Sequence, residues 1–212
     1  MKAKAIVIII FFIAGFYGCR NKSSNNKQAE NQNFLVTESL KNRIIREGKN
    51  ISQSTVSVFQ KHLKQAINAG GIDSAINYCH SKAMFLTDSL SGVYSVKIKR
   101  MAKKNRNPFN FLDKQGEKVF NEYQKELASA QPLKPKILIN EKGNPVYYAP
   151  IRLGKDVCLK CHGTPKKEIT EKRMILLKKY YPEDKAVNFK KGDLRGVWAI
   201  TFDKASLEKK NL

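Results

Sequence analysis

Apolar residues recur three or four positions apart in the stretch that follows residue 33, which is the spacing of an amphipathic helix. The pattern is carried by Val36, Leu40, Ile44, Val58, Leu63 and Ala66. We expect one long helix, or two in succession, ending at Gly70–Gly71, because glycine is a poor helix former. Asp73 then has the character of an N-cap for a shorter helix over residues 74–86.

The pattern changes to alternation of apolar and polar residues in YSVKIKR, residues 94–100, which is typical of a half-buried strand. The composition of NRNPFN, residues 105–110, indicates a loop. Helical spacing returns over residues 111–130. The apolar face of this expected helix holds Val119, Tyr123 and Leu127.

The second half of the chain is richer in strand patterns. PKILI and PVYYAPIRL, separated by the glycine-bearing NEKGN, predict a hairpin over residues 135–153. A basic amphipathic helix is expected from about residue 168 to residue 180, and GDLRGVWAITF, residues 192–202, predicts a closing strand. We find no internal repeat, so residues 34–212 are expected to form one α+β domain.

The first 18 residues, MKAKAIVIIIFFIAGFYG, have a basic start followed by an apolar run from Ala5 to Phe16. This layout is typical of a secretory signal, and the run is too short to span a bilayer comfortably. FYGC, residues 16–19, resembles a bacterial lipobox, although a lipobox usually has Leu where Phe16 stands. We expect residues 1–18 to be a lipoprotein signal peptide and Cys19 to be acylated. An ordinary signal peptide or an uncleaved anchor are the alternatives.

Residues 19–33 are expected to form a flexible tether, because residues 20–33 contain no large apolar side chain. The predicted location is therefore the bacterial cell envelope, with a lipid-anchored domain that faces the periplasm or the cell exterior. Loss of Lys2 and Lys4 with the signal lowers the net charge only from +22 to +20. Export argues against nucleic acid as a partner. The basic surface is either simply solvated, or it attracts anionic lipid or an acidic protein.

Cys158, Cys161 and His162 form C-x-x-C-H, the attachment motif of c-type haem. Two thiols three positions apart can add to the vinyl groups of a porphyrin, and the adjacent imidazole can reach the iron. A zinc site would need a second ligand pair at finger-like spacing, which the chain does not have. A redox dithiol would leave the histidine unexplained. We expect one covalent haem c, which bacteria attach outside the cytoplasm.

Cys79 is the one thiol that these assignments leave over among the four cysteines. It could be the second axial ligand of the iron, or a buried cysteine that packs as a small apolar residue. His80 is a rival ligand, and adjacent helical residues point about 100° apart, so only one of the two can face a haem. Cys79 shares a face with Ala75, Ile76 and Ala83, but His80 also lies one turn from Ile76, so the choice stays open.

Four segments, in this order, resemble the PAS-like c-type haem family of Tll-type haem proteins, often labelled a domain of unknown function. The segments are AINYCHSKA, KRMAKKNRNPFN, YYAPIRLGKDVCLKCHG and GDLRGVWAI, and the likeness covers about residues 35–205. The resemblance implies a PAS-like antiparallel sheet flanked by helices, with one covalent haem.

Site residues follow from the same resemblance. Cys158 and Cys161 match the thioether cysteines, His162 the proximal ligand and Cys79 the distal ligand. The family's RNPxN loop, near the haem pocket, is matched by Arg106, Asn107, Pro108 and Asn110. A proline and an acidic residue are expected soon after that loop, where this chain has Phe111-Leu112-Asp113.

Three functions agree with such a site. The first is single-electron transfer or redox sensing, with a redox partner that the sequence does not name. The second is a sensor of a small gas that displaces the distal ligand. The third, an enzyme such as a peroxidase, is the weakest, because a six-coordinate iron has no open position for a substrate. We therefore expect a carrier or sensor and no catalysis.

Overall fold

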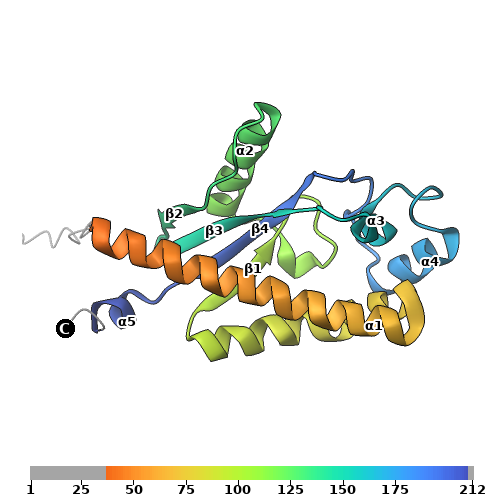
Figure 1. Cartoon of the computed structure of the whole chain (residues 1–212), viewed down its shortest axis with the longest axis horizontal. Helices are drawn as coiled ribbons and strands as arrows, with labels where there is room; N and C mark the ends of the chain where they lie inside the picture. The colour runs from red at the N-terminus through yellow and green to blue at the C-terminus, as the bar shows by residue number, and fades with distance from the viewer. Residues whose placement is uncertain (1–36, 210–212) are drawn as a thin grey trace, which may run out of the picture. The chain divides into compact units, whose positions relative to one another are not determined.

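The structure is a computed structural model, and it describes residues 37–209 (Figure 1). The predicted signal peptide, the predicted acylation of Cys19 and the predicted tether fall on residues outside the described ones, so these three remain predictions.

The predicted break at Gly70–Gly71 is confirmed. It divides α1 (Glu38–Tyr94) into two helical arms, because Gly70 and Gly71 leave helical geometry and Gly71 has a φ of 71°. The second arm returns beside the first (Figure 1), and the rings of His62 and Tyr78 stack between them at 5.7 Å. The second arm ends at Tyr94, eight residues beyond the predicted end.

The prediction for Asp73 is wrong. Asp73 lies inside the second arm, and its carboxylate pairs with Arg173 at 3.2 Å and with Lys172 at 3.4 Å. Both partners belong to α4 (Glu171–Tyr180). The acidic side chain therefore ties α1 to α4, a contact between residues about a hundred positions apart that helix-capping rules do not consider.

The four strands form one antiparallel sheet in the order β1-β4-β3-β2. They are β1 (Lys97–Met101), β2 (Lys136–Ile139), β3 (Pro145–Arg152) and β4 (Leu194–Thr201). The predicted hairpin is confirmed as β2–β3, and the predicted closing strand as β4. Strand β4 takes the position between β1 and β3, so it joins the two halves of the chain.

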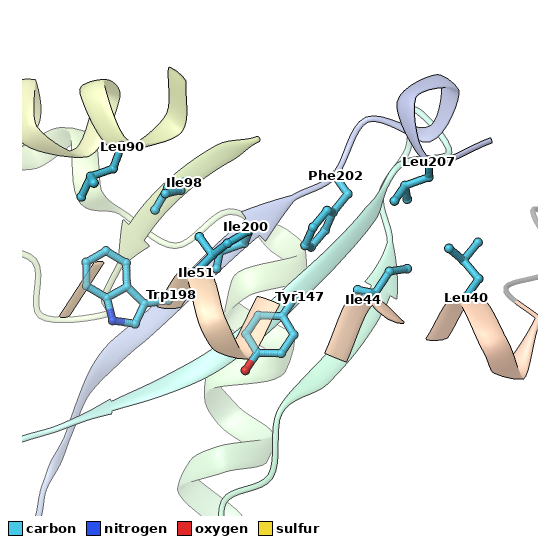
Figure 2. Close-up of a cluster of buried hydrophobic side chains, with 10 residues drawn as sticks. All are labelled: Leu40, Ile44, Ile51, Leu90, Ile98, Tyr147, Trp198, Ile200, Phe202 and Leu207. Atoms are coloured by element: carbon cyan, nitrogen blue, oxygen red, sulfur yellow. The ribbon is translucent and has the colours of Figure 1, made fainter. Parts of the chain in front are cut away.

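Side chains alternate between the two faces of the sheet, as a pleated strand requires. Tyr147, Trp198 and Ile200 pack against α1 in a buried cluster (Figure 2). Val146 and Val197, next to them in sequence, lie in a second buried cluster on the opposite face. That second cluster also contains Val119, Phe120 and Tyr123 of α2 (Lys114–Ala128). Each face of the sheet therefore has its own helical cover.

The remaining helices are short. They are η1 (Pro108–Asn110), α3 (Asp156–His162), α4 and α5 (Lys204–Lys209), and the pattern of the sequence did not indicate α5. The predicted α+β class is confirmed: an antiparallel sheet is flanked by helices and preceded by a long N-terminal helix. Among residues 37–209, no helix is both long and apolar enough to cross a membrane.

Candidate functional site

A cavity of about 300 Å³ lies at the end of the sheet where β1 ends and β4 begins. Its walls come from both arms of α1, from β1 and β4, from the 105–110 loop and from α3. Most of the lining is apolar, and the volume is at the lower end of what ligand pockets have. A second hollow, of about 630 Å³, lies at the opposite end of the sheet, and none of the cysteines or histidines among residues 37–209 lines it.

The C-x-x-C-H motif forms one side of the 300 Å³ cavity. Cys158 and Cys161 both line it, one turn apart on α3, and both are half-buried free thiols. The helix ends at His162, and a Cβ on the following Gly163 would lie 2.7 Å from the carbonyl oxygen of Leu159 and 2.7 Å from the Cβ of Glu168. Only glycine therefore lets the chain turn away directly after His162.

His162 also lines the cavity, with its imidazole held from behind. Its Nδ1 lies 2.9 Å from the carbonyl oxygen of Ala186, so the tautomer that fits this contact donates from Nδ1 and leaves the Nε2 lone pair free. Burial lowers the pKa of His162 well below its usual value, and the nearby guanidiniums of Arg195 and Arg106 lower it further. The imidazole is therefore neutral, the form that binds a metal.

Arg106 fixes the segment that holds His162. Its guanidinium donates to the carboxylate of Asp184 at 3.0 Å, to the carbonyl oxygen of Cys161 at 2.6 Å and to that of Ala186 at 3.2 Å. Asp184 in turn accepts from the backbone N–H of Ala186 at 2.7 Å. The two charged side chains are only 13% and 5% exposed. The loop arginine that the resemblance placed near a haem thus lines the cavity and also braces the histidine.

The rest of the RNPxN segment closes one edge of the cavity. Asn107 and Asn110 line it, and the side chain of Asn107 caps η1 by accepting from the backbone N–H of Phe109 at 3.0 Å. Pro108 begins η1 and is not among the lining residues. Its fixed φ suits the first position of a helical turn, so its place in the structure is that of a support for the loop.

Cys79 and His80 point in different directions. Cys79 lines the cavity together with Ala75, Ile76 and Ala83, the residues that the helical pattern placed on its face. The imidazole of His80 stacks on the ring of Tyr180 at 4.5 Å, outside the lining. Burial raises the pKa of the Cys79 thiol, while Arg100 and Arg106 act against this rise. Of the two rivals, the structure brings Cys79 to the cavity.

Arg100 and Arg195 lie within the segments that carry the family resemblance, but the sequence analysis did not single them out, and both line the cavity. Arg100 lies on the same face of β1 as the buried Ile98, and an inward-facing arginine in a half-buried strand is a signal that could have found it. Arg195 sits at an irregularity of β4, where the register skips from Gly196 to Leu194. Such a bulge changes the direction in which a side chain points, and a local sequence pattern does not predict it.

Within the described part of the chain, no group of three or more His, Cys, Asp or Glu side chains gathers to hold a metal ion directly. A porphyrin supplies four ligands of its own to iron and takes only axial ligands from a protein. The free Nε2 of His162, the two thiols on α3 and the apolar walls fit such a group.

Comparisons with known proteins agree with the resemblance of the sequence segments. The structure is similar to a solved structure described as the crystal structure of the cyanobacterial heme-protein Tll0287, with a TM-score of 0.50 and 21% sequence identity. The similarity covers 72% of this chain and 95% of that chain, and it concerns the fold. No curated protein sequence matches. The model of the Tll0287-like family matches residues 25–202, so the chain belongs to the Tll0287-like family.

Proposed function

We propose that the domain binds one haem c covalently through Cys158 and Cys161, with His162 and Cys79 as its two axial ligands. One observation carries the proposal: α3 and the second arm of α1 present all four side chains to a single, largely apolar cavity. The fold shared with a protein described as a haem protein supports it.

The haem, when bound, would supply one-electron chemistry at its iron, and the chain's part is to hold and insulate that iron. His162 offers a neutral imidazole that a backbone carbonyl orients. The apolar walls exclude water, and a thiolate ligand donates electron density that favours ferric iron, so we expect a low reduction potential. Single-electron transfer or redox sensing follows as the proposed role. The proposal does not include catalysis.

We further propose that the domain works at the bacterial cell envelope. The proposal is supported by the basic and apolar start of the chain, and by FYGC, which places Cys19 where a lipobox has its acylated cysteine. The domain would then face the periplasm or the cell exterior, and its net basic charge would favour anionic lipid or an acidic redox partner. Mass spectrometry of the mature N-terminus tests this, and an unmodified Cys19 would refute it.

Covalent attachment is tested by expressing the full chain together with the haem-attachment machinery of bacteria. After denaturation and extraction with acidified organic solvent, the colour should stay with the protein. A variant in which both Cys158 and Cys161 are replaced by Ser should release it, and Cys79→Ser should not. Extractable colour from the native chain would contradict covalent binding.

The distal ligand is tested by two substitutions one residue apart, Cys79→Ser and His80→Ala. Cys79→Ser should abolish the low-spin ferric signature of thiolate ligation in absorption and electron paramagnetic resonance spectra. His80→Ala should leave that signature unchanged, because His80 packs on Tyr180 outside the cavity. The reverse result would make the site bis-histidine.

A second role, the sensing of a small gas, is favoured by one observation. Cys79 belongs to the second arm of α1, whereas both thioether cysteines and His162 belong to α3, so the distal contact is the one that can open without loss of the haem. A distal ligand of this kind could be displaced after reduction. Carbon monoxide or nitric oxide added to the reduced protein should then change its absorption spectrum, whereas a pure electron carrier would keep its spectrum.

A further inference from the structure

Three guanidinium groups converge on the cavity, and a carboxylate pairs with one of them. Arg100, Arg106 and Arg195 all line it, and Asp184 pairs with Arg106. The guanidiniums of Arg100 and Arg106 lie close enough to that of Arg195 to lower its pKa, and burial is the larger cause of its fall to about 9. Arginine stays charged at neutral pH even so, which leaves this end of the cavity with an excess of positive charge.

One donor nitrogen of Arg195 has no hydrogen-bond partner in the described part of the chain. One of its terminal nitrogens donates to the carbonyl oxygen of Lys104 at 3.0 Å, but its Nε is buried without a hydrogen-bond partner in the described part of the chain. Its guanidinium lies 5.4 Å from the centre of the Phe189 ring. A buried donor on a charged group is costly to leave unpaired, so this nitrogen points to a missing acceptor.

Arg100 is in a similar position. Its guanidinium lies 5.3 Å from the centre of the Phe59 ring, and among residues 37–209 it has no hydrogen bond or ion pair. Burial lowers the pKa of Arg100, the side chains of Cys79 and Tyr181 act against this fall, and Arg106 lowers the pKa further. The aromatic contact stabilises a cation but supplies no negative charge. Neither Arg100 nor Arg195 has an ion pair in the described part of the chain, and Asp184, the carboxylate that acts on Arg195, already pairs with Arg106.

We propose that Arg100 and Arg195 bind the two propionate carboxylates of the haem. The inference rests on the proposed function, because it assigns to these residues the polar ends of a group whose body the apolar walls hold. A haem is a flat apolar ring with two carboxylates, and the planar fork of a guanidinium matches a carboxylate with paired, charge-assisted hydrogen bonds. Arg100 and Arg195 thus offer one guanidinium for each of the two propionates.

The site of the two arginines follows from strand pairing. Arg100 pairs with Trp198 across β1 and β4, and Arg195 lies three residues before Trp198 on β4. The bulge leaves Arg195 without a paired residue on β3, so it can turn toward the cavity. Gly196, beside it, allows β4 to approach β1 so closely that a Cβ would collide with the backbone of Met101.

The test uses the full haem-loaded chain and the variants Arg100→Gln and Arg195→Gln. Arg152→Gln is the matched control, because Arg152 also lines the cavity but is exposed and donates to the carbonyl oxygen of Gly192. We expect the propionate bending bands in the resonance Raman spectrum to shift in the first two variants and not in the control. The reduction potential should also fall in those two variants, since a lost cation favours the more positive ferric state.

Each outcome decides a different point. Retained covalent haem with unchanged propionate bands and potential in both variants would overturn this inference and leave the proposed function standing. Native protein without covalent haem would overturn both. If a glutamine variant does not accumulate with haem, the lysine variant at the same position decides. Lysine keeps the positive charge but not the planar pair of donors of a guanidinium. The propionate bending bands should therefore shift while the reduction potential stays near that of the native protein, and unchanged bands would refute the inference.

Discussion

Removal of the Asp184 side chain tests whether the brace behind His162 is a structural determinant. In Asp184→Ala, Arg106 loses its ion partner while its side chain stays only 13% exposed, and the backbone N–H of Ala186 loses its acceptor. Breaking a buried ion pair from one side destabilises a protein by about 3–5 kcal/mol. For a chain of this length we expect a fall in Tm on the order of 10 °C.

The assay is urea unfolding of the haem-loaded protein, followed by circular dichroism. Asp156→Ala is the matched control: Asp156 pairs with Lys191 at 3.0 Å, the same distance, but the two side chains are 81% and 57% exposed. An exposed pair contributes about 0–1 kcal/mol, so this variant should unfold almost as the native protein does.

Asp184→Asn separates charge from hydrogen bonding. Its side-chain oxygen can still accept from Ala186, while the charge opposite Arg106 is lost, so its stability should lie between those of Asp184→Ala and the native protein. If Asp184→Ala costs no more than Asp156→Ala, the reasoning from burial is refuted. Because Ala186 orients His162, the low-spin spectrum should also become heterogeneous in Asp184→Ala but not in Asp156→Ala.

Two further predictions concern packing and pH. Gly48→Ala should destabilise the protein by about 1–3 kcal/mol, because the added Cβ would collide with the buried ring of Tyr147. Gly92→Ala should stabilise it by about 0.5–1 kcal/mol, because the added Cβ has no atom within 4 Å and alanine is the better helix former. Chemical unfolding measures both effects. Burial raises the pKa of Tyr123, so the folded state keeps a proton that the unfolded state loses above about pH 10, and stability should fall from there as pH rises, by up to about 1.4 kcal/mol per pH unit. Tyr123→Phe should show a shallower alkaline fall, and an identical pH profile would contradict the assignment.

Local patterns were sufficient to predict most of the elements of this fold, although not α5. Two adjacent glycines end a helix wherever they stand, and a glycine-bearing polar turn between two apolar runs forms a hairpin because both signals lie within a few residues. The same holds for C-x-x-C-H, whose chemistry depends on spacing within one turn. The helical repeat likewise placed Cys79 on one face with Ala75 and Ala83, and the structure has all three at the cavity.

Local sequence patterns could not predict contacts between residues that are far apart in the chain. Asp73 follows the glycine pair, so its local sequence indicated a helix cap. Its partner, Arg173, is a hundred residues away and does not appear in any local pattern. The choice between Cys79 and His80 depended on where α4 lies, since Tyr180 occupies the direction in which His80 points. Arg195 faces the cavity only because β3 and β4 pair with a bulge, and strand pairing is a property of the whole sheet.

The glycine break in α1 is what makes a site from these distant parts. It turns the second arm back along the first, so that Cys79 lines the same cavity as Cys158 and Cys161, about eighty residues later in the chain. Ion pairs fasten both sides: Asp73 joins the second arm to α4, and Arg106 joins the loop after β1 to Asp184. Since α3 and the 184–186 segment are held by these contacts, the two predicted axial ligands are fixed by independent parts of the fold. A displacement of one arm would therefore alter the distal side while His162 keeps its backbone hydrogen bond.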